Sequence, residues 1–154
     1  MNRRQRTADV CAFALIFLFV YTASAKLFQW QVFELQLGRF PWIGHLSTLL
    51  TWAVPAVELI VAGLLLVGRM RRPGFYAALT LMLVFTLYLA LMLGSQKHLP
   101  CSCGGVISWM NWQQHLLFNL VFIGIAITGL VYSPPKIQHY EIEHHQKTFI
   151  PDRI

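Results

Sequence analysis

Four long stretches almost free of charge constrain this chain more than any other feature. They cover residues 10–28, 49–67, 74–94 and 113–132. Each has the roughly 20 residues that a helix needs to cross about 30 Å of hydrocarbon. Backbone groups in lipid must pair within their own segment, and the stretches show no period-two alternation, so strands are excluded. The sequence predicts an all-α integral membrane protein, a four-transmembrane-helix bundle that forms a single membrane domain over residues 1–154.

The first stretch needs separate attention because it imitates a cleaved secretory signal. Basic residues precede it, and Ala23-Ser24-Ala25 near its end resembles a cleavage site. The apolar run is nevertheless long for a signal, and Asp9 is unusual in the basic segment of one. We therefore interpret it as a retained helix, which agrees with a chain that is 56% hydrophobic and only 12% charged.

The distribution of Lys and Arg predicts the orientation of the bundle. Nine of the twelve flank the same ends of the predicted helices. The other three are Lys26, Arg39 and Lys97. Because positive residues accumulate on the cytoplasmic side, we expect a bacterial inner-membrane protein whose termini, 69–73 turn and tail (residues 133–154) are cytoplasmic. The 29–48 and 95–112 connections would then face outward. The net charge of +6 is read as this topology signal with some attraction for anionic lipid, and no nucleic-acid partner is predicted.

Two cysteines separated by one residue are predicted on the outward, oxidising side, in the segment Pro100-Cys101-Ser102-Cys103-Gly104-Gly105. A bond between Cys101 and Cys103 would close a very small ring and would need a bent backbone. Strain of this kind raises the reduction potential, so such a disulfide suits exchange better than structural stapling. We therefore predict Cys101 and Cys103 as a catalytic thiol pair. The alternatives are a passive staple of the loop and two unreactive thiols.

The third cysteine, Cys11, is predicted a membrane thickness away, as a packed small hydrophobic residue. Quinone-linked disulfide generators relay electrons through two thiol pairs, and this chain has one. A disulfide relay would therefore need a second thiol pair on a partner, or a cofactor that reacts directly with Cys101 and Cys103. No cofactor is certain from the sequence, and quinone stays open as that cofactor. Whether the chain is itself an enzyme or a component of a thiol-disulfide oxidoreductase is also left open.

A single acidic residue, Glu58, lies near the middle of the second stretch. A charge there costs several kcal/mol, so we expect Glu58 inside the bundle, neutral or paired. Lys26, at the outer end of the first stretch, is a candidate partner, although Glu58 lies about two turns deeper. A structural pair that fixes helix register and a proton-handling or ligand-binding role are both open.

Two histidines flank the cysteine pair, His98 before it and His115 at the start of the fourth stretch. Together with Cys101 and Cys103 they offer two nitrogens and two sulfurs, a set that would hold Zn or Cu in a metal-binding alternative. Either imidazole would instead stabilise a thiolate. Asn119 lies one turn after His115 on the same helix face, so the two are predicted to line one pocket.

Two further patterns concern packing. The first outward connection predicts a short interfacial helix before Pro41, because apolar residues recur there at near-helical spacing. They are Trp30, Phe33, Leu37 and Phe40. Close contacts between helices are expected at four glycines. They are Gly63, Gly68, Gly124 and Gly129.

Taken in order, these residues resemble the MauE/DoxX-like family of redox-associated membrane proteins, named for the methylamine-utilisation MauE type. The resemblance spans nearly all four predicted helices. Its segments are Ala23-Ser24-Ala25-Lys26-Leu27, Phe33 with Pro41, Pro55 with Glu58-Leu59, Cys101-Ser102-Cys103-Gly104-Gly105 and His115-Leu116-Leu117-Phe118-Asn119. The chain departs from the family pattern at Gly104, where an aromatic residue is usual, and at Phe118, where Arg commonly precedes the Asn.

The resemblance implies a bundle like that of vitamin K epoxide reductase, working beside a thioredoxin-like protein in disulfide formation or maturation of exported proteins. We therefore predict an inner-membrane redox protein whose Cys101 and Cys103 exchange with a periplasmic thioredoxin-like partner. An adjoining pocket would be formed by Glu58, Lys26, His115 and Asn119. Two alternatives are a metal-binding module and a non-catalytic scaffold subunit of a larger membrane complex, in which the cysteines are incidental.

Overall fold

A computed structural model describes residues 3–38, 44–95 and 112–133, and every regular element within these ranges is helical. The long helices are α1 (Arg3–Phe28), α3 (Ser47–Leu66), α4 (Arg71–Ser95) and α5 (Trp112–Tyr132). The short elements are α2 (Trp30–Gly38) and two 3₁₀ turns, η1 (Gly44–Leu46) and η2 (Gly68–Met70). The four long helices are long and apolar enough to cross a membrane. The predicted all-α, four-span architecture is confirmed, and so is the short helix after the first span.

The helix α1 begins at Arg3, earlier than its apolar stretch predicts, because hydropathy marks only the part that suits lipid. A hydrogen bond and an ion pair hold the polar first turns of α1. The Thr7 hydroxyl donates to the Arg3 carbonyl at 3.2 Å, and Asp9 forms an ion pair with Arg71 of α4. Pro73 is tolerated near the start of α4 because the first turn has no intrahelical partner for its backbone nitrogen.

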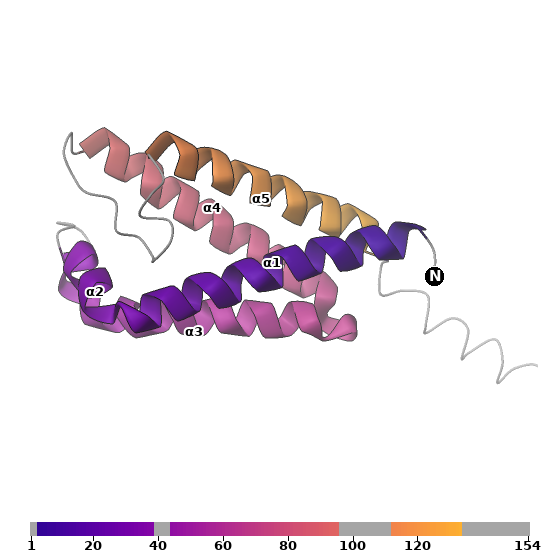
Figure 1. The fold of residues 1–154 in the computed structure, drawn as a ribbon, viewed down its shortest axis with the longest axis horizontal. Coiled ribbons are helices and arrows are strands. Elements are labelled where there is room, and N and C mark those ends of the chain that lie inside the picture. Colours follow the sequence, from indigo (N-terminus) through magenta and orange to yellow (C-terminus); the bar gives the residue numbers. More distant parts are fainter. Residues whose placement is uncertain (1–2, 39–43, 96–111, 134–154) are drawn as a thin grey trace, which may run out of the picture.

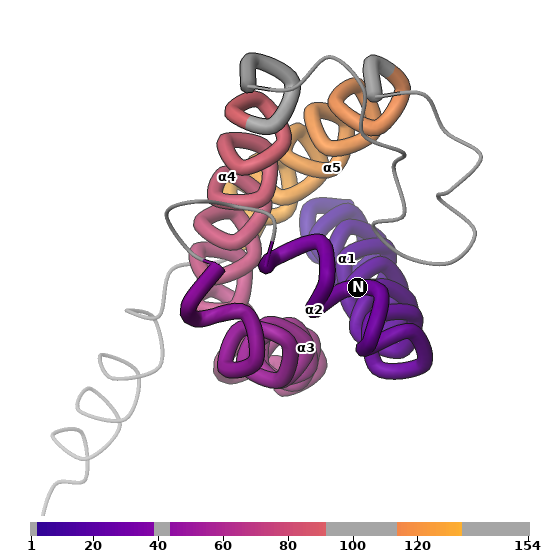
Figure 2. The backbone as a smooth tube through the Cα atoms, turned by 90° about the vertical axis from the view of Figure 1, so that its left-hand side faces the viewer, coloured from indigo at the N-terminus to yellow at the C-terminus, as the bar shows by residue number. Residues whose placement is uncertain are grey.

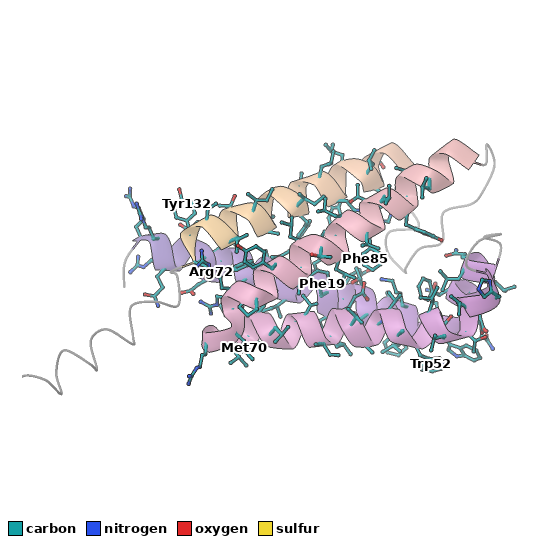
Figure 3. All side chains as sticks on the ribbon, turned by 180° about the vertical axis from the view of Figure 1, so that it is seen from behind. Phe19, Trp52, Met70, Arg72, Phe85 and Tyr132 are labelled. Atoms are coloured by element: carbon teal, nitrogen blue, oxygen red, sulfur yellow. The ribbon has the colours of Figure 1, made fainter. Side chains whose placement is uncertain are left out.

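The long helices form a ring in which α1 packs on α3 and α5, and α4 completes it by packing on α5 and α3. Figure 2, viewed nearly along the helices, shows this order. The start of α1, the η2 turn and the end of α5 lie at one end of the bundle, whereas α2 lies at the other (Figure 1). The labelled Met70, Arg72 and Tyr132 accordingly lie opposite Trp52 (Figure 3). The two described basic segments, at the start of α1 and around η2, therefore share one end, as the charge pattern predicts.

The core lies between the helices and is apolar in the half nearer the basic end. Cys11, Leu15 and Phe19 recur once per turn on α1 and meet Leu65 of α3 and Phe75 of α4 in one buried cluster. Cys11 is buried among apolar side chains, as predicted. Further along α1 toward α2, polar side chains join this interior face.

Only one of the four glycines chosen from the sequence is at a tight contact. A Cβ atom on Gly129 would lie 2.2 Å from the Phe75 ring, whereas one on Gly63, Gly68 or Gly124 would meet nothing within 4 Å. The prediction is wrong for these three because they are exposed on the outside of the bundle. The sequence missed Gly74, whose Cβ would come within 3.0 Å of the Leu65 backbone.

We expect Gly129→Ala to lower the free energy of unfolding by about 1–3 kcal/mol, because the added methyl group overpacks the contact with Phe75. Gly124→Ala, on the same helix but facing outward, is the matched control and should change stability by less than about 0.5 kcal/mol. Denaturant unfolding of the purified protein in micelles measures both. Equal losses for the two variants would contradict the close packing of α5 on Phe75.

Candidate functional site: a buried polar pocket

The centre of the site is Glu58, whose residue exposure is 0%. Thr51, Pro55, Glu58 and Leu65 follow one another at three- to seven-residue steps along α3 and are all buried. This spacing keeps them on one helix face, which turns the carboxylate into the bundle. Glu58 therefore lies inside the bundle, as the cost of a charge in lipid requires.

One oxygen of Glu58 accepts bonds from two residues of α1. Lys26 Nζ lies 2.7 Å from Glu58 Oε1, and the Thr22 hydroxyl donates to the same oxygen at 3.1 Å. Thr22 and Lys26 are four residues apart, so both project from the same face of α1. The ion pair between Lys26 and Glu58, a candidate from the sequence, is present. Thr22 lies one turn before Lys26 on α1 and also bonds to Glu58.

Lys26 reaches this position by turning its side chain inward, and only 11% of that side chain is exposed. Its ammonium group lies 5.2 Å from the ring centroid of Phe85 on α4 and 5.9 Å from that of Phe33 on α2. Both rings are within cation–π range. The ammonium group is therefore held by a carboxylate and by aromatic faces, largely away from solvent.

Around this pair lies a cavity of about 200 Å³ to which all five α-helices contribute. Its polar and charged lining comprises Thr22, Lys26, Glu58, His115 and Asn119, and its aromatic lining comprises Phe19, Phe33, Phe85, Tyr88 and Phe118. Phe19 and Phe85 lie between the α4 ribbon and the α1 and α3 ribbons in Figure 3. The cavity is thus an apolar, aromatic space with one charged, hydrogen-bonding wall.

His115 and Asn119 supply the part of that wall contributed by α5. They lie one helical turn apart, and both are buried. His115 Nδ1 and Glu58 Oε2 are buried without a hydrogen-bond partner among the described residues. A buried polar atom left unpaired costs about 1–3 kcal/mol. These two atoms therefore mark places in the cavity wall that are suited to a ligand group.

The helix α2 lies across the end of the bundle and contributes Phe33 and Leu37 to the cavity (Figure 2). Two contacts attach α2 to the start of α3. The Thr48 hydroxyl donates to Glu34 Oε1 at 2.6 Å, and the Trp30 and Trp52 rings stack with centroids 6.2 Å apart. These contacts between α2 and the start of α3 help to fix the end wall of the cavity.

The structure brings together all four residues that the sequence assigns to a pocket: Lys26, Glu58, His115 and Asn119. The other candidate site residues, His98, Cys101 and Cys103, lie outside the described residues. Three of the four residues of the alternative metal site are therefore not described. Within ranges 3–38, 44–95 and 112–133, no group of His, Cys, Asp or Glu is arranged to hold a metal ion.

Sequence reasoning missed several residues of the site. Thr22 has a usable signal, because it lies one turn before Lys26 on the same helix face and carries a hydroxyl group. Phe85 and Tyr88 have no comparable signal, because α4 is apolar on every face and nothing in its pattern shows which side turns inward.

The fold and the pocket define a small multi-pass helical membrane protein with a charged, aromatic-lined pocket inside its bundle. The chain belongs to the MauE family: the family model described as methylamine utilisation protein MauE matches residues 4–132. The match includes the four long helices, except for Arg3 at the start of α1, and every pocket residue named above. The resemblance inferred from the sequence is confirmed. Neither the search of curated proteins nor that of solved structures found a significant match.

Proposed function

We propose that this protein is an inner-membrane thiol–disulfide redox protein in which Cys101 and Cys103 exchange with a periplasmic thioredoxin-like partner. The observation that carries the proposal is the gathering of Lys26, Glu58 and His115 in one buried pocket at the end of the bundle where α4 ends and α5 begins. The sequence that connects these two helices contains the cysteine pair. The helix ends that flank the cysteine pair in the sequence, the end of α4 and the start of α5, thus lie at the same end of the bundle as the polar pocket.

The exchange itself balances without another reactant. A thiolate of the partner attacks one sulfur of the Cys101–Cys103 disulfide, breaks that bond and forms a mixed disulfide. The partner's second thiolate then attacks the mixed disulfide. Two electrons and two protons pass to Cys101 and Cys103, and the partner leaves with its own disulfide. The reverse sequence of steps would reduce the partner instead. A cationic group beside the pair would favour the thiolate, and Lys26 and His115 are suited to this role.

A periplasmic location of the cysteine pair agrees with the shared basic end of the bundle. Arg69, Arg71 and Arg72 lie at the same end as the arginines that start α1. With this end in the cytoplasm, both termini are cytoplasmic and the pocket end faces outward. Reporter fusions after Ser95 and at the C-terminus should therefore report opposite compartments, the first periplasmic and the second cytoplasmic. The same compartment for both would contradict the four-span orientation.

The unpartnered Nδ1 atom of His115 favours a second candidate function. An imidazole with a free nitrogen is suited to a metal ion, and His98, Cys101 and Cys103 would complete a set for Zn or Cu(I). In this case the protein would hold a metal without catalysing exchange.

Thiol trapping in cells tests the proposed function. The Cys11→Ala variant has only Cys101 and Cys103 left as cysteines. We expect this pair to be at least partly oxidised, and we expect its oxidised fraction to change when the thioredoxin-like redox couple of the periplasm is changed. Metal analysis of the purified protein is the companion measurement. Reduced cysteines with one Zn or Cu ion per chain would establish the second candidate, and a disulfide that never responds to the redox couple would exclude exchange.

A further inference from the structure

We propose that the pocket binds the ring of a lipid-soluble quinone, which reaches it from the membrane between α3 and α4. The proposal rests on the proposed function for one point only, the use of that ring as the oxidant of the cysteine pair. In that step the Cys101 and Cys103 thiols give two electrons and two protons to the quinone, which becomes the hydroquinone, and the Cys101–Cys103 disulfide forms. Binding itself is argued from the pocket alone.

The residues that line the cavity indicate an opening between α3 and α4. The helices α3 and α4 are joined by the short η2 turn at the basic end and diverge toward the other end (Figures 1 and 3). Leu50 and Val54 of α3 and Val84 and Phe85 of α4 line the cavity in this diverging half. Val84 is 55% exposed although it also lines the cavity. Since the outer surface of a membrane-spanning bundle faces lipid, this opening admits molecules dissolved in the bilayer.

The size and walls of the cavity favour a single flat ring. A cavity of about 150 Å³ lined by apolar side chains is known to hold benzene, so about 200 Å³ leaves room for a substituted ring. Phe19, Phe33, Phe85, Phe118 and Tyr88 supply aromatic faces against which such a ring packs. A long apolar tail would remain outside, in the lipid between α3 and α4.

The polar wall requires oxygen atoms on that ring. Lys26 Nζ carries three N–H groups, one of which donates to Glu58 Oε1. A ring carbonyl would accept from Lys26 or from His115, and a ring hydroxyl would donate to the unpaired Oε2 of Glu58. The oxidised ring needs donors and the reduced ring needs an acceptor, and this wall offers both. A lipid acyl chain would leave these buried atoms unpaired, which the desolvation of polar groups penalises.

Binding is tested with menadione, a naphthoquinone, on the full chain carrying Cys101→Ser and Cys103→Ser and reconstituted in phosphatidylcholine nanodiscs. We expect saturable quenching of tryptophan fluorescence and binding about tenfold or more tighter than that of 2-methylnaphthalene, which has the same rings without oxygens. The substitution His115→Ala should reduce this difference. Equal binding of the two probes would show an apolar cavity only and would overturn the proposal, as would no saturable binding.

A second pair of variants tests the route of entry without touching the polar wall. Val84→Trp places a large ring at the opening and should weaken menadione binding about tenfold or more. Leu87→Trp is the matched control, because Leu87 is similarly exposed on α4 (61%) but does not line the cavity. Equal effects of the two would overturn the lateral opening. Menadione binding is measured in a variant without Cys101 and Cys103, so its result does not depend on thiol exchange. If this variant does not bind menadione while the unmodified protein still exchanges thiols, the quinone proposal is wrong and the proposed function stands.

Discussion

Lys26→Met is expected to lower the free energy of unfolding by about 3–5 kcal/mol, because it leaves the buried Glu58 carboxylate without its cation. Glu58→Gln should also be costly, since it leaves the ammonium group of Lys26 in an aromatic, largely dry environment. In the Lys26→Met variant, the bond from Thr22 still satisfies one oxygen of Glu58 but does not neutralise its charge. Denaturant unfolding in micelles measures each loss.

The double variant Lys26→Met with Glu58→Gln separates the ion pair from the packing around it. Because no uncompensated charge remains, its loss should fall short of the sum of the single losses by at least about 2 kcal/mol. The Asp9–Arg71 pair is the matched control, since its side chains are 25% and 23% exposed. Its coupling should stay below about 1 kcal/mol. Additive losses at Lys26 and Glu58 would show that the two charges do not stabilise one another.

The spans and the charged pair follow from the sequence because lipid penalises exposed backbone and unpaired charge so strongly. That penalty places Glu58 inside the bundle whatever the details of packing. It also favours a cation as its neighbour, and Lys26 is the nearest one in the first helix. The inward-turned ammonium group of Lys26 also lies near the ring of Phe85, a neighbour that its distance along the sequence does not predict.

The sequence does not predict in the same way which face of each remaining helix turns into the bundle. In a soluble protein a polar stripe marks the exposed side of a helix, but lipid and protein interior are both apolar. The sequence therefore cannot tell that Phe85 faces the cavity while Leu87 faces outward, or that Gly129 is in contact and Gly124 is not. The placement of α4, and with it the aromatic half of the pocket, required the structure.

Replacement of either Cys101 or Cys103 by Ser is expected to abolish disulfide exchange with a thioredoxin-like protein, because each change removes one of the two sulfurs between which the bond breaks and forms. Cys11→Ala should leave the exchange rate unchanged. Cys11 is buried among apolar side chains and does not line the pocket. The measurement is the rate at which purified protein in nanodiscs oxidises or reduces a thioredoxin-like protein, with a chelator present and the reaction stopped by acid and thiol trapping.

The two single Ser variants also assign the roles of the cysteines. If the partner attacks Cys101, the Cys103→Ser variant should accumulate the mixed disulfide, because Cys103 is then missing as the second thiolate that would resolve it. The Cys101→Ser variant should accumulate none, and the reverse pattern would assign the attacked sulfur to Cys103. Full exchange in both variants would mean that the pair does not carry the reaction. Loss of exchange only when metal is removed would instead favour a metal held by the cysteines and His115. If cells carrying both Ser changes also keep full maturation of exported disulfide proteins, the chain acts as a scaffold, and the polar pocket around Glu58 serves the bundle rather than the thiols.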